Sequence, residues 1–128
     1  MTVVDSSVLV EYFIDGDKIS EAAAAISEEP VAPHLIDAEV GNALRRLAAR
    51  GAIDEDDAGQ SLVDLAGLPL TRSPHRFLLG SAWAMRSQLS FYDALYAALA
   101  AELDTELVTA DGRLARAARS LGVRTRAI

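Results

Sequence analysis

Short continuous runs of apolar residues mark the expected strands of this chain. The run Thr2–Val4 is β-branched throughout and stops at a charged residue, Asp5, which predicts a short buried strand. A second strand of this kind is expected at residues 106–109, and others at 68–71 and 123–125. Residues 29–33 (EPVAP) are expected to form a short extended link.

Helical spacing of apolar residues occupies most of the remaining chain. Residues 34–50 form an amphipathic pattern that ends before Gly51, with one face made of Ile36, Val40, Ala43, Leu44 and Leu47. Residues 91–103 (FYDALYAALAAEL) are apolar on nearly every side, so this helix should be buried, with Ser90 as its cap. Further helices are expected at residues 7–13, 17–28, 54–66, 73–85 and 111–121.

Strands that alternate with helices predict an α/β fold with a mostly parallel central sheet flanked by helices. The chain has no internal repeat, low-complexity segment or linker, so a single domain over residues 1–128 is expected. Ligands of such sheets bind at the carboxyl ends of the strands. Asp5 and Asp111 both follow expected strands, and the candidate chemistry therefore lies at that edge.

Composition narrows the class of protein. Hydrophobic residues make up 51% of the 128 residues, which is typical of a folded globule. Cysteine is absent, which excludes disulfides and thiolate metal sites. No apolar run approaches the roughly 18 residues of a membrane span, and no basic segment precedes an apolar one as in a signal peptide. A cytoplasmic protein with no membrane association is expected.

The charge distribution leaves nucleic-acid binding open. The formal net charge is −7, which by itself disfavours an anionic partner. Arginines nevertheless gather in two segments, and arginine suits phosphate well. The first segment holds Arg45, Arg46 and Arg50, and the second holds Arg113, Arg116, Arg119, Arg124 and Arg126. These side chains form either RNA-binding faces or solvated helix faces, and charge alone favours neither.

Each of four acidic residues has both a structural and a functional interpretation. Asp5 could cap a helix, but Ser6 and Ser7 could do so without burying a charge, which favours function. Asp93 fits the capping pattern S-x-x-D with Ser90. Glu39 has no basic residue three or four positions later, so the usual helix salt bridge is missing. Asp111 precedes Gly112 and suits a turn or a cap.

The four acids together have a chemistry that none has alone. Two carboxylates about 4 Å apart repel by roughly 4 kcal/mol at an effective dielectric constant near 20. Such a cluster is tolerated when its members are protonated or share a divalent cation. Ligands that are all oxygen favour Mg²⁺ or Mn²⁺ over zinc. Spacing in the sequence does not establish that the four converge.

Four segments in order resemble the successive motifs of PIN-domain endoribonucleases, above all the toxins of VapBC-type type II toxin–antitoxin modules. They are MTVVDSSVLVEYF, LIDAEVGNALRRL, LSFYDALYAALA and LVTADGRLARAA. The order and spacing of the motifs are specific, although each motif alone is weak. The acidic quartet of the family matches Asp5, Glu39, Asp93 and Asp111, and its hydroxyl positions match Ser7 and Thr109.

The resemblance implies a PIN fold and a Mg²⁺-dependent hydrolysis of RNA phosphodiester bonds, with Mn²⁺ able to substitute. The four acids would be catalytic and would hold the metal or orient its waters, and Ser7 and Thr109 would support them. Asp111 would complete a second metal site or act mainly around the first. On the helix that carries Glu39, Asn42 lies near the same edge as the RNA-binding candidates Arg46 and Arg50. Arg113 and Arg116 are the other RNA-binding candidates.

The family also implies protein partners. Its toxins are held inactive by a cognate antitoxin, and a net charge of −7 suits a basic partner. A toxin homodimer is expected, with a higher-order complex when the antitoxin is present. Phe77, Trp83 and Met85 could contribute to such surfaces, but packing in the core is the first expectation for each.

Other functions are less well supported by the residues. An inactive PIN scaffold that binds RNA or protein is one alternative. A small Mg²⁺-dependent phosphoryl-transfer or receiver-type domain is another. However, Ser7 stands where an aspartyl-nucleophile phosphatase has a second Asp. A receiver domain would need a lysine near its acids, whereas Lys18, the chain's one lysine, lies in the expected second helix. Metal-free cleavage through the 2′-OH usually needs paired acid–base groups. The two histidines, His34 and His75, each follow a proline-containing helix start and are expected to be helix-terminal residues.

Overall fold

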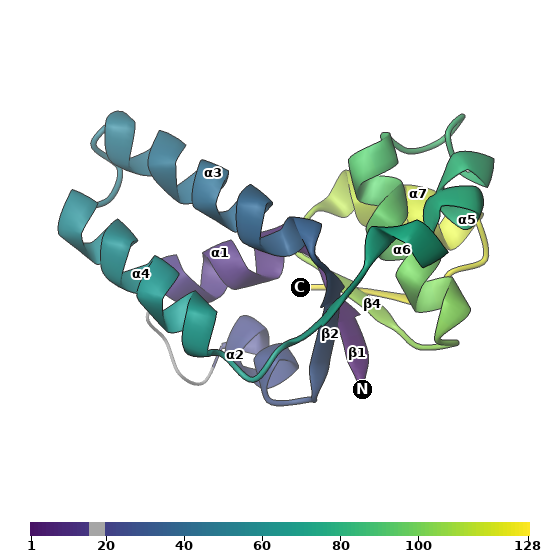
Figure 1. Cartoon of the computed structure of the whole chain (residues 1–128), viewed down its shortest axis with the longest axis horizontal. Helices are drawn as coiled ribbons and strands as arrows, with labels where there is room; N and C mark the ends of the chain where they lie inside the picture. The colour runs from purple at the N-terminus through teal and green to yellow at the C-terminus, as the bar shows by residue number, and fades with distance from the viewer. Residues whose placement is uncertain (16–19) are drawn as a thin grey trace.

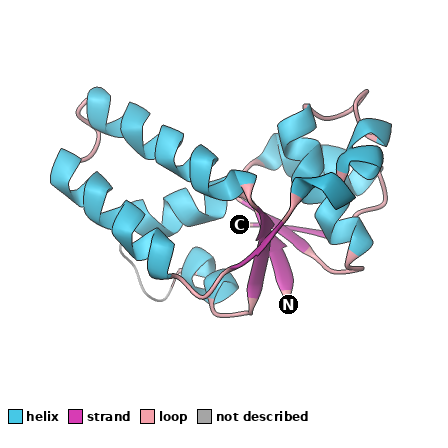
Figure 2. Cartoon of the chain, viewed as in Figure 1, coloured by secondary structure: helices cyan, strands magenta, loops and turns pink. Residues whose placement is uncertain are grey.

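The computed structural model describes residues 1–15 and 20–128, and within them a five-stranded sheet lies between two groups of helices (Figures 1 and 2). The elements follow in the order β1 (Thr2–Val4), α1 (Ser6–Asp15), α2 (Glu21–Ile26), β2 (Pro30–Pro33), α3 (Leu35–Ala49), α4 (Glu55–Gly67), β3 (Thr71–Ser73), the 3-10 helix η1 (His75–Phe77), α5 (Leu79–Ala84), α6 (Phe91–Glu102), β4 (Leu107–Thr109), α7 (Gly112–Ser120) and β5 (Thr125–Ala127). Every strand pair is parallel. The predicted α/β class with a parallel sheet is confirmed.

The strand order β3-β2-β1-β4-β5 places the beginning of the chain at the centre of the sheet. Val3 pairs with Val31 of β2 on one side and with Leu107 of β4 on the other. From β1 the chain moves outward to β2 and β3, then returns to β4 and β5 on the opposite side. Helices α1 to α4 lie on one side of the sheet and α5 to α7 on the other (Figure 1).

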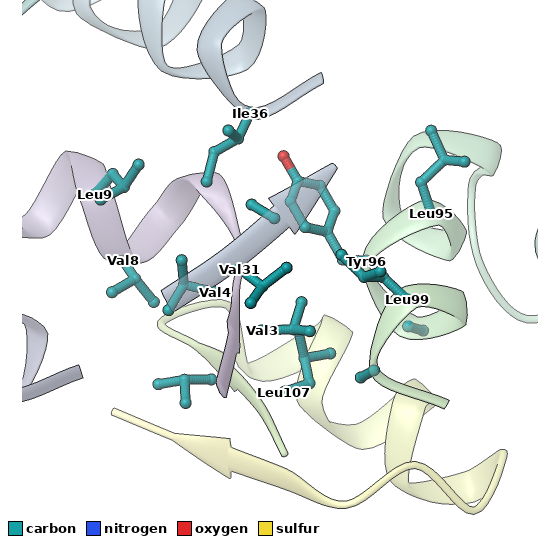
Figure 3. Packing of buried hydrophobic residues seen from close by; sticks show 14 of the residues in the cluster. Val3, Val4, Val8, Leu9, Val31, Ile36, Leu95, Tyr96, Leu99 and Leu107 are labelled. Carbon is teal, nitrogen blue, oxygen red and sulfur yellow. The ribbon is translucent and has the colours of Figure 1, made fainter. Parts of the chain in front are cut away.

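The core lies where β1, β2 and β4 meet the helices on either side. Val3, Val4 and Leu107 of the strands are fully buried, and Ile36 of α3 and Tyr96 of α6 reach them from opposite sides (Figure 3). Seven consecutive residues of α6, from Ala94 to Ala100, are buried. The expectation of a buried helix is confirmed. The small alanines of α6 allow it to pack closely against the sheet.

Two of the expected strands lie elsewhere in the structure. The link expected at residues 29–33 is the inner strand β2, paired on both sides. Prolines stand only at its two ends, so Val31 and Ala32 still have amides for the ladder. Strand β3 is Thr71–Ser73 instead of 68–71, and β5 is Thr125–Ala127 instead of 123–125. Pairing with a neighbouring strand, which sequence patterns do not contain, sets these bounds.

The helix expected at residues 73–85 is divided. Ser73, which precedes Pro74 as a helix cap would, instead ends β3 and pairs with Pro33. The short helices η1 and α5 then follow separately. The helix expected at residues 17–28 is α2, Glu21–Ile26. Its expected first residues fall in 16–19, which include Lys18 and lie outside the described residues.

The expectation that Phe77 and Trp83 pack in the core is wrong. Their exposed fractions are 68% and 60%. Arg76 and Arg86 stack on the two rings, with guanidinium carbons 4.7 Å and 4.6 Å from the ring centres. Met85 is partly buried against the core, as expected. The division of the helix at Leu78, which is itself buried, turns the two aromatic rings away from the sheet.

A partly exposed ion pair ties α3 to strand β3 and helix α4. The Arg72 guanidinium donates to both carboxylate oxygens of Asp37, at 2.6 and 2.9 Å, and to the carbonyls of Leu65 and Leu70. Asp37 also lies in the first turn of α3, where the helix dipole favours an acid, and the bidentate arginine adds a stronger, charge-assisted contact. In the described part of the chain no helix combines the length and the apolar character needed to cross a bilayer.

Candidate active site

The acids that follow β1 and β4 lie at neighbouring carboxyl ends of the sheet. Strands β1 and β4 pair directly, with Val4 opposite Val108. Connections leave these two strands toward opposite sides of the sheet, which is the switch point where parallel sheets hold ligands. Asp5 comes directly after β1, and Asp111 comes two residues after Thr109, the last residue of β4.

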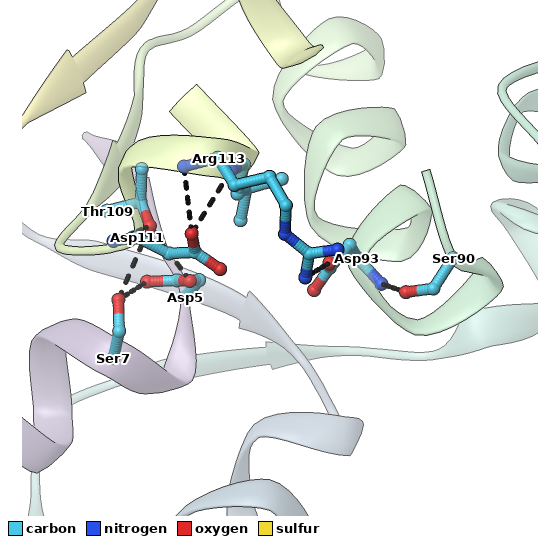
Figure 4. Close-up of polar contacts among 8 residues, drawn as sticks. Asp5, Ser7, Ser90, Asp93, Thr109, Asp111 and Arg113 are labelled. Carbon is cyan, nitrogen blue, oxygen red and sulfur yellow. Dashed lines mark hydrogen bonds and ion pairs between the residues drawn. The ribbon is translucent and has the colours of Figure 1, made fainter. Parts of the chain in front are cut away.

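Asp5 is a buried carboxylate held by two hydroxyl groups. It is 5% exposed. Ser7 Oγ donates to its Oδ1 at 2.5 Å, and Thr109 Oγ1 donates to its Oδ2 at 2.9 Å. The hydroxyls in turn accept from the backbone amides of Ala110 and Asp111, at 2.9 and 3.0 Å. Each hydroxyl is thereby fixed between an amide donor and Asp5 (Figure 4).

Burial raises the pKa of Asp5 to about 6, although the hydrogen bonds from Ser7 and Thr109 oppose the rise and the nearby charge of Asp111 adds to it. No ion pair to Asp5 occurs among residues 1–15 and 20–128. A carboxylate in this position costs free energy when ionised unless it gains a positive partner. At neutral pH, above this pKa, the arrangement therefore favours a bound cation beside Asp5.

Asp111 has the capping role that the sequence suggested and still lies at the site. Its Oδ1 accepts from the backbone amides of Arg113 and Leu114, at 3.0 and 3.2 Å, and begins α7. Its charge contributes to raising the pKa of both Asp5 and Asp93. Asp111 therefore caps α7 and also belongs to the acidic cluster.

Asp93 likewise combines a helix start with a place at the site. Ser90 Oγ accepts from the Asp93 amide at 3.2 Å, as the capping pattern predicted. The Asp93 carboxylate lies 3.9 Å from Arg113 Nη2 (Figure 4). Burial, followed by the charge of Asp111, raises the pKa of Asp93, while Arg113 opposes the rise.

Glu39 is held from across the sheet by a tyrosine that sequence reasoning missed. Tyr96 Oη donates to Glu39 Oε1 at 2.6 Å. Burial raises the pKa of Glu39, the Tyr96 hydrogen bond opposes the rise, and the charge of Asp93 adds to it. Burial and the neighbouring Glu39 raise the pKa of Tyr96 as well, so its hydroxyl stays protonated. Tyr96 follows Asp93 by three residues on one helix, which was the available signal.

The four acids influence one another but do not converge on one point. Asp111 acts on Asp5 and Asp93, and Asp93 acts on Glu39. Within the described ranges, no group of three His, Asp or Glu side chains is placed to hold a metal ion as it stands. The all-oxygen donor set fits Mg²⁺ or Mn²⁺ in chemistry.

The other predicted residues lie on exposed helix surfaces. Asn42 is exposed and accepts from Arg45 at 3.3 Å. Arg46 and Arg50 are exposed and line a hollow of about 310 Å³ on α3 with Ala43 and Leu47. Arg116 is exposed on α7, with Nη1 beside Gly112. Of the four arginines proposed for RNA, the described structure brings only Arg113 into an ion pair with an acid of the quartet.

The histidines have structural positions. His75 Nε2 accepts from the backbone amide of Leu35 at 2.9 Å, at the start of α3. The His34 and His75 rings lie edge to face, with centres 6.5 Å apart. Both are helix-terminal residues, as expected.

Comparison with known proteins shows which family the chain belongs to. The PIN-domain family model matches residues 2–120. Ribonuclease VapC1 of Mycobacterium tuberculosis is 41% identical over 118 residues, which cover 90% of this chain and 89% of VapC1. Among solved structures, PAE2754 from Pyrobaculum aerophilum superimposes with a TM-score of 0.67 at 29% identity, covering 91% of this chain and 84% of that one.

A second solved structure shares the fold at much lower identity. VapBC2 from Rickettsia felis, bound to a DNA fragment from its promoter, gives a TM-score of 0.70 at 12% identity, covering 98% of this chain and 97% of that one. The match of the family model to nearly the whole chain, together with 41% identity to VapC1, is decisive. The chain therefore belongs to the PIN-domain family and, within it, to the VapC group.

Proposed function

We propose that this protein is the toxin of a VapBC-type type II toxin–antitoxin module and acts as a metal-dependent endoribonuclease. The observation that carries the proposal is Asp5, a buried carboxylate with a raised pKa at the switch point of the sheet. The ribonuclease name of the relative VapC1 supports the activity.

The four acids would share one catalytic site, in which Asp5, Glu39, Asp93 and Asp111 hold Mg²⁺ directly or through water. Mn²⁺ is expected to substitute for it. A divalent cation bound there would supply a polarised water and offset charge on the phosphate. Asp111 has one carboxylate oxygen committed to the cap of α7, so it contributes through the other.

The protein's own groups would orient the site and bind RNA. Ser7 and Thr109 fix both oxygens of Asp5 through bonds that begin at backbone amides, which keeps the carboxylate from rotating. Asn42, Arg46 and Arg50 would continue the site along α3, and Arg113 and Arg116 would border it on α7. Arginine at these positions would bind phosphate through its guanidinium group.

Cleavage of total cellular RNA by antitoxin-free protein with Mg²⁺ or Mn²⁺ tests this function. We expect discrete fragments that disappear with EDTA and with Asp93→Asn, because that variant removes a metal-binding charge but keeps the shape of the side chain. Asp64→Asn is the matched control, since Asp64 is an exposed acid on α4.

The outcomes of this experiment separate the alternatives. Cleavage that survives EDTA or Asp93→Asn would contradict the metal mechanism. No cleavage together with no Mn²⁺ binding by calorimetry would favour an inactive PIN scaffold that binds RNA or protein. The third possibility, a small phosphoryl-transfer domain, has no supporting observation in the described structure.

We further propose a basic antitoxin as partner and a homodimer as the state of the free toxin. The net charge of −7 suits a basic protein segment across the acidic site. An equimolar cognate antitoxin should abolish the RNA cleavage. Light scattering on the purified toxin should give twice the mass of 13.6 kDa, and a monomer mass at micromolar concentration would refute the homodimer. A cytoplasmic location stays a prediction.

A further inference from the structure

Arg113 is the basic residue that the fold brings to the acidic cluster. Its backbone amide donates to Asp111 at 3.0 Å, which fixes its position in the first turn of α7. Its side chain extends toward Asp93, and Nη2 lies 3.9 Å from Asp93 Oδ2 (Figure 4). The residue is therefore anchored by one acid of the cluster and directed at another.

The contact with Asp93 is loose. The Arg113 side chain is 81% exposed and the Asp93 side chain 24% exposed. Exposed ion pairs of this length are weak, so a change of partner costs little. The Arg72–Asp37 pair is different, because its two hydrogen bonds of 2.6 and 2.9 Å are joined by bonds to two backbone carbonyls. Arg72 is a structural clamp, whereas the contact of Arg113 with Asp93 is long and exposed to solvent.

The charges at the site give this weak contact a use. Four carboxylates repel an RNA phosphate, and burial already disfavours the ionised form of Asp5. A guanidinium beside Asp93 lowers the local negative charge while the site is empty of cations. A divalent cation on Asp93 would repel the Arg113 guanidinium. A phosphate oxygen of the RNA would then be the best available partner of the guanidinium.

We propose that Arg113 exchanges partners during function: it is the counter-ion of Asp93 in the metal-free protein and binds the RNA phosphate when a divalent cation takes its place. This inference rests on the proposed metal-dependent nuclease function. It predicts that Arg113 competes with the metal for Asp93 but helps to bind the RNA. Removal of the Arg113 charge should therefore strengthen the binding of the metal and weaken the binding of the RNA.

Calorimetric titration of the protein with MnCl₂, without RNA, tests the first half. Arg113→Gln should bind Mn²⁺ about two- to fivefold more tightly than the wild type, because an exposed ion pair no longer competes. Arg113→Lys keeps the charge and should stay near the wild-type affinity. Arg116→Gln removes the same charge one turn further along α7 and should change the Mn²⁺ affinity by less than about twofold.

Cleavage of total RNA at saturating Mn²⁺ tests the second half. Arg113→Gln should cut about tenfold more slowly, as expected for the loss of a charge-assisted contact, and Arg113→Lys should recover part of the rate. Wild-type cleavage by Arg113→Gln would overturn the phosphate contact. Equal Mn²⁺ affinities in the glutamine variants and the wild type would overturn the competition, although the nuclease function would stand. A wild type that binds no Mn²⁺ would refute both the partner exchange and the metal-dependent nuclease function.

Discussion

Asp5→Asn is expected to lower metal-dependent RNA cleavage by about a thousandfold or more and yet to stabilise the metal-free protein at neutral pH. The loss of activity follows from removing the most buried negative charge of the site, and a thousandfold corresponds to roughly 4 kcal/mol of activation free energy. The gain in stability follows because the ionised form of Asp5 is disfavoured by burial.

The difference between the folded and unfolded pKa values of Asp5 determines whether its ionisation stabilises or destabilises the protein. The pKa of Asp5 rises from 3.8 in the unfolded chain to about 6 in the folded one. Between these values the folded state binds more protons, so the stability of the wild type decreases as pH rises through this interval. Well below pH 3.8 the carboxyl is neutral in both states, and above about pH 7 it is ionised in both, so the destabilisation is then complete, up to about 3 kcal/mol.

Urea unfolding in EDTA at pH 4, 5, 6 and 7.5 measures this difference. We expect Asp5→Asn to exceed the wild type by only about 0.5 kcal/mol at pH 4 and by about 1–3 kcal/mol at pH 7.5. Asp64→Asn, on the exposed side of α4, is the control and should show no such trend. Added Mn²⁺ should stabilise the wild type more than Asp5→Asn. A difference that is the same at every pH would contradict the assignment.

Tyr96→Phe is expected to reduce RNA cleavage about 10- to 100-fold, the usual effect of removing a hydrogen bond to a metal-binding group. Tyr96 is 1% exposed, and the phenylalanine ring fills the same space. The variant removes one hydroxyl, whose bond to Glu39 is 2.6 Å long. Stability should fall by only about 1 kcal/mol, because Glu39 is half-buried and gains water in place of the hydroxyl.

The pH profile of cleavage distinguishes a positioning role from general damage. The Tyr96 hydrogen bond lowers the pKa of Glu39, so its loss should move the acidic limb of the profile to higher pH. Tyr92→Phe is the matched control, since Tyr92 is on the same helix and 62% exposed. Steady-state rates from pH 5 to 8 measure both variants. A fall in rate without a shift of the profile would indicate that Tyr96 supports only the fold.

The elements that the sequence predicted well are those whose signals are local. Strands β1 and β4 are short apolar runs that stop at polar residues, and α3 and α6 have helical spacing with clear ends. Capping residues are also local signals, and Ser90 and Asp111 act as caps. The family resemblance added the order of the motifs, which no single segment contains.

The errors occur where a partner distant in the sequence decides the conformation. Strand β2 was hidden by its prolines, because its pairing with β1 and β3 is what makes it a strand. Ser73 has a good capping pattern, but pairing with Pro33 keeps it in β3. Phe77 and Trp83 have core-forming side chains, and the break at Leu78 leaves them exposed.

By itself, the sequence determined the fold class, the four acids and the hydroxyls beside them. Only the tertiary structure decided how these groups meet. Thr109 donates to Asp5 across 104 positions of the chain, and Tyr96 donates to Glu39 across 57. Arg113 reaches Asp93 because α6 and α7 begin at the same edge of the sheet. Residue types and local periodicity set which chemistry is possible, whereas burial and distance, which set the pKa values and partners, depend on the packing of remote segments.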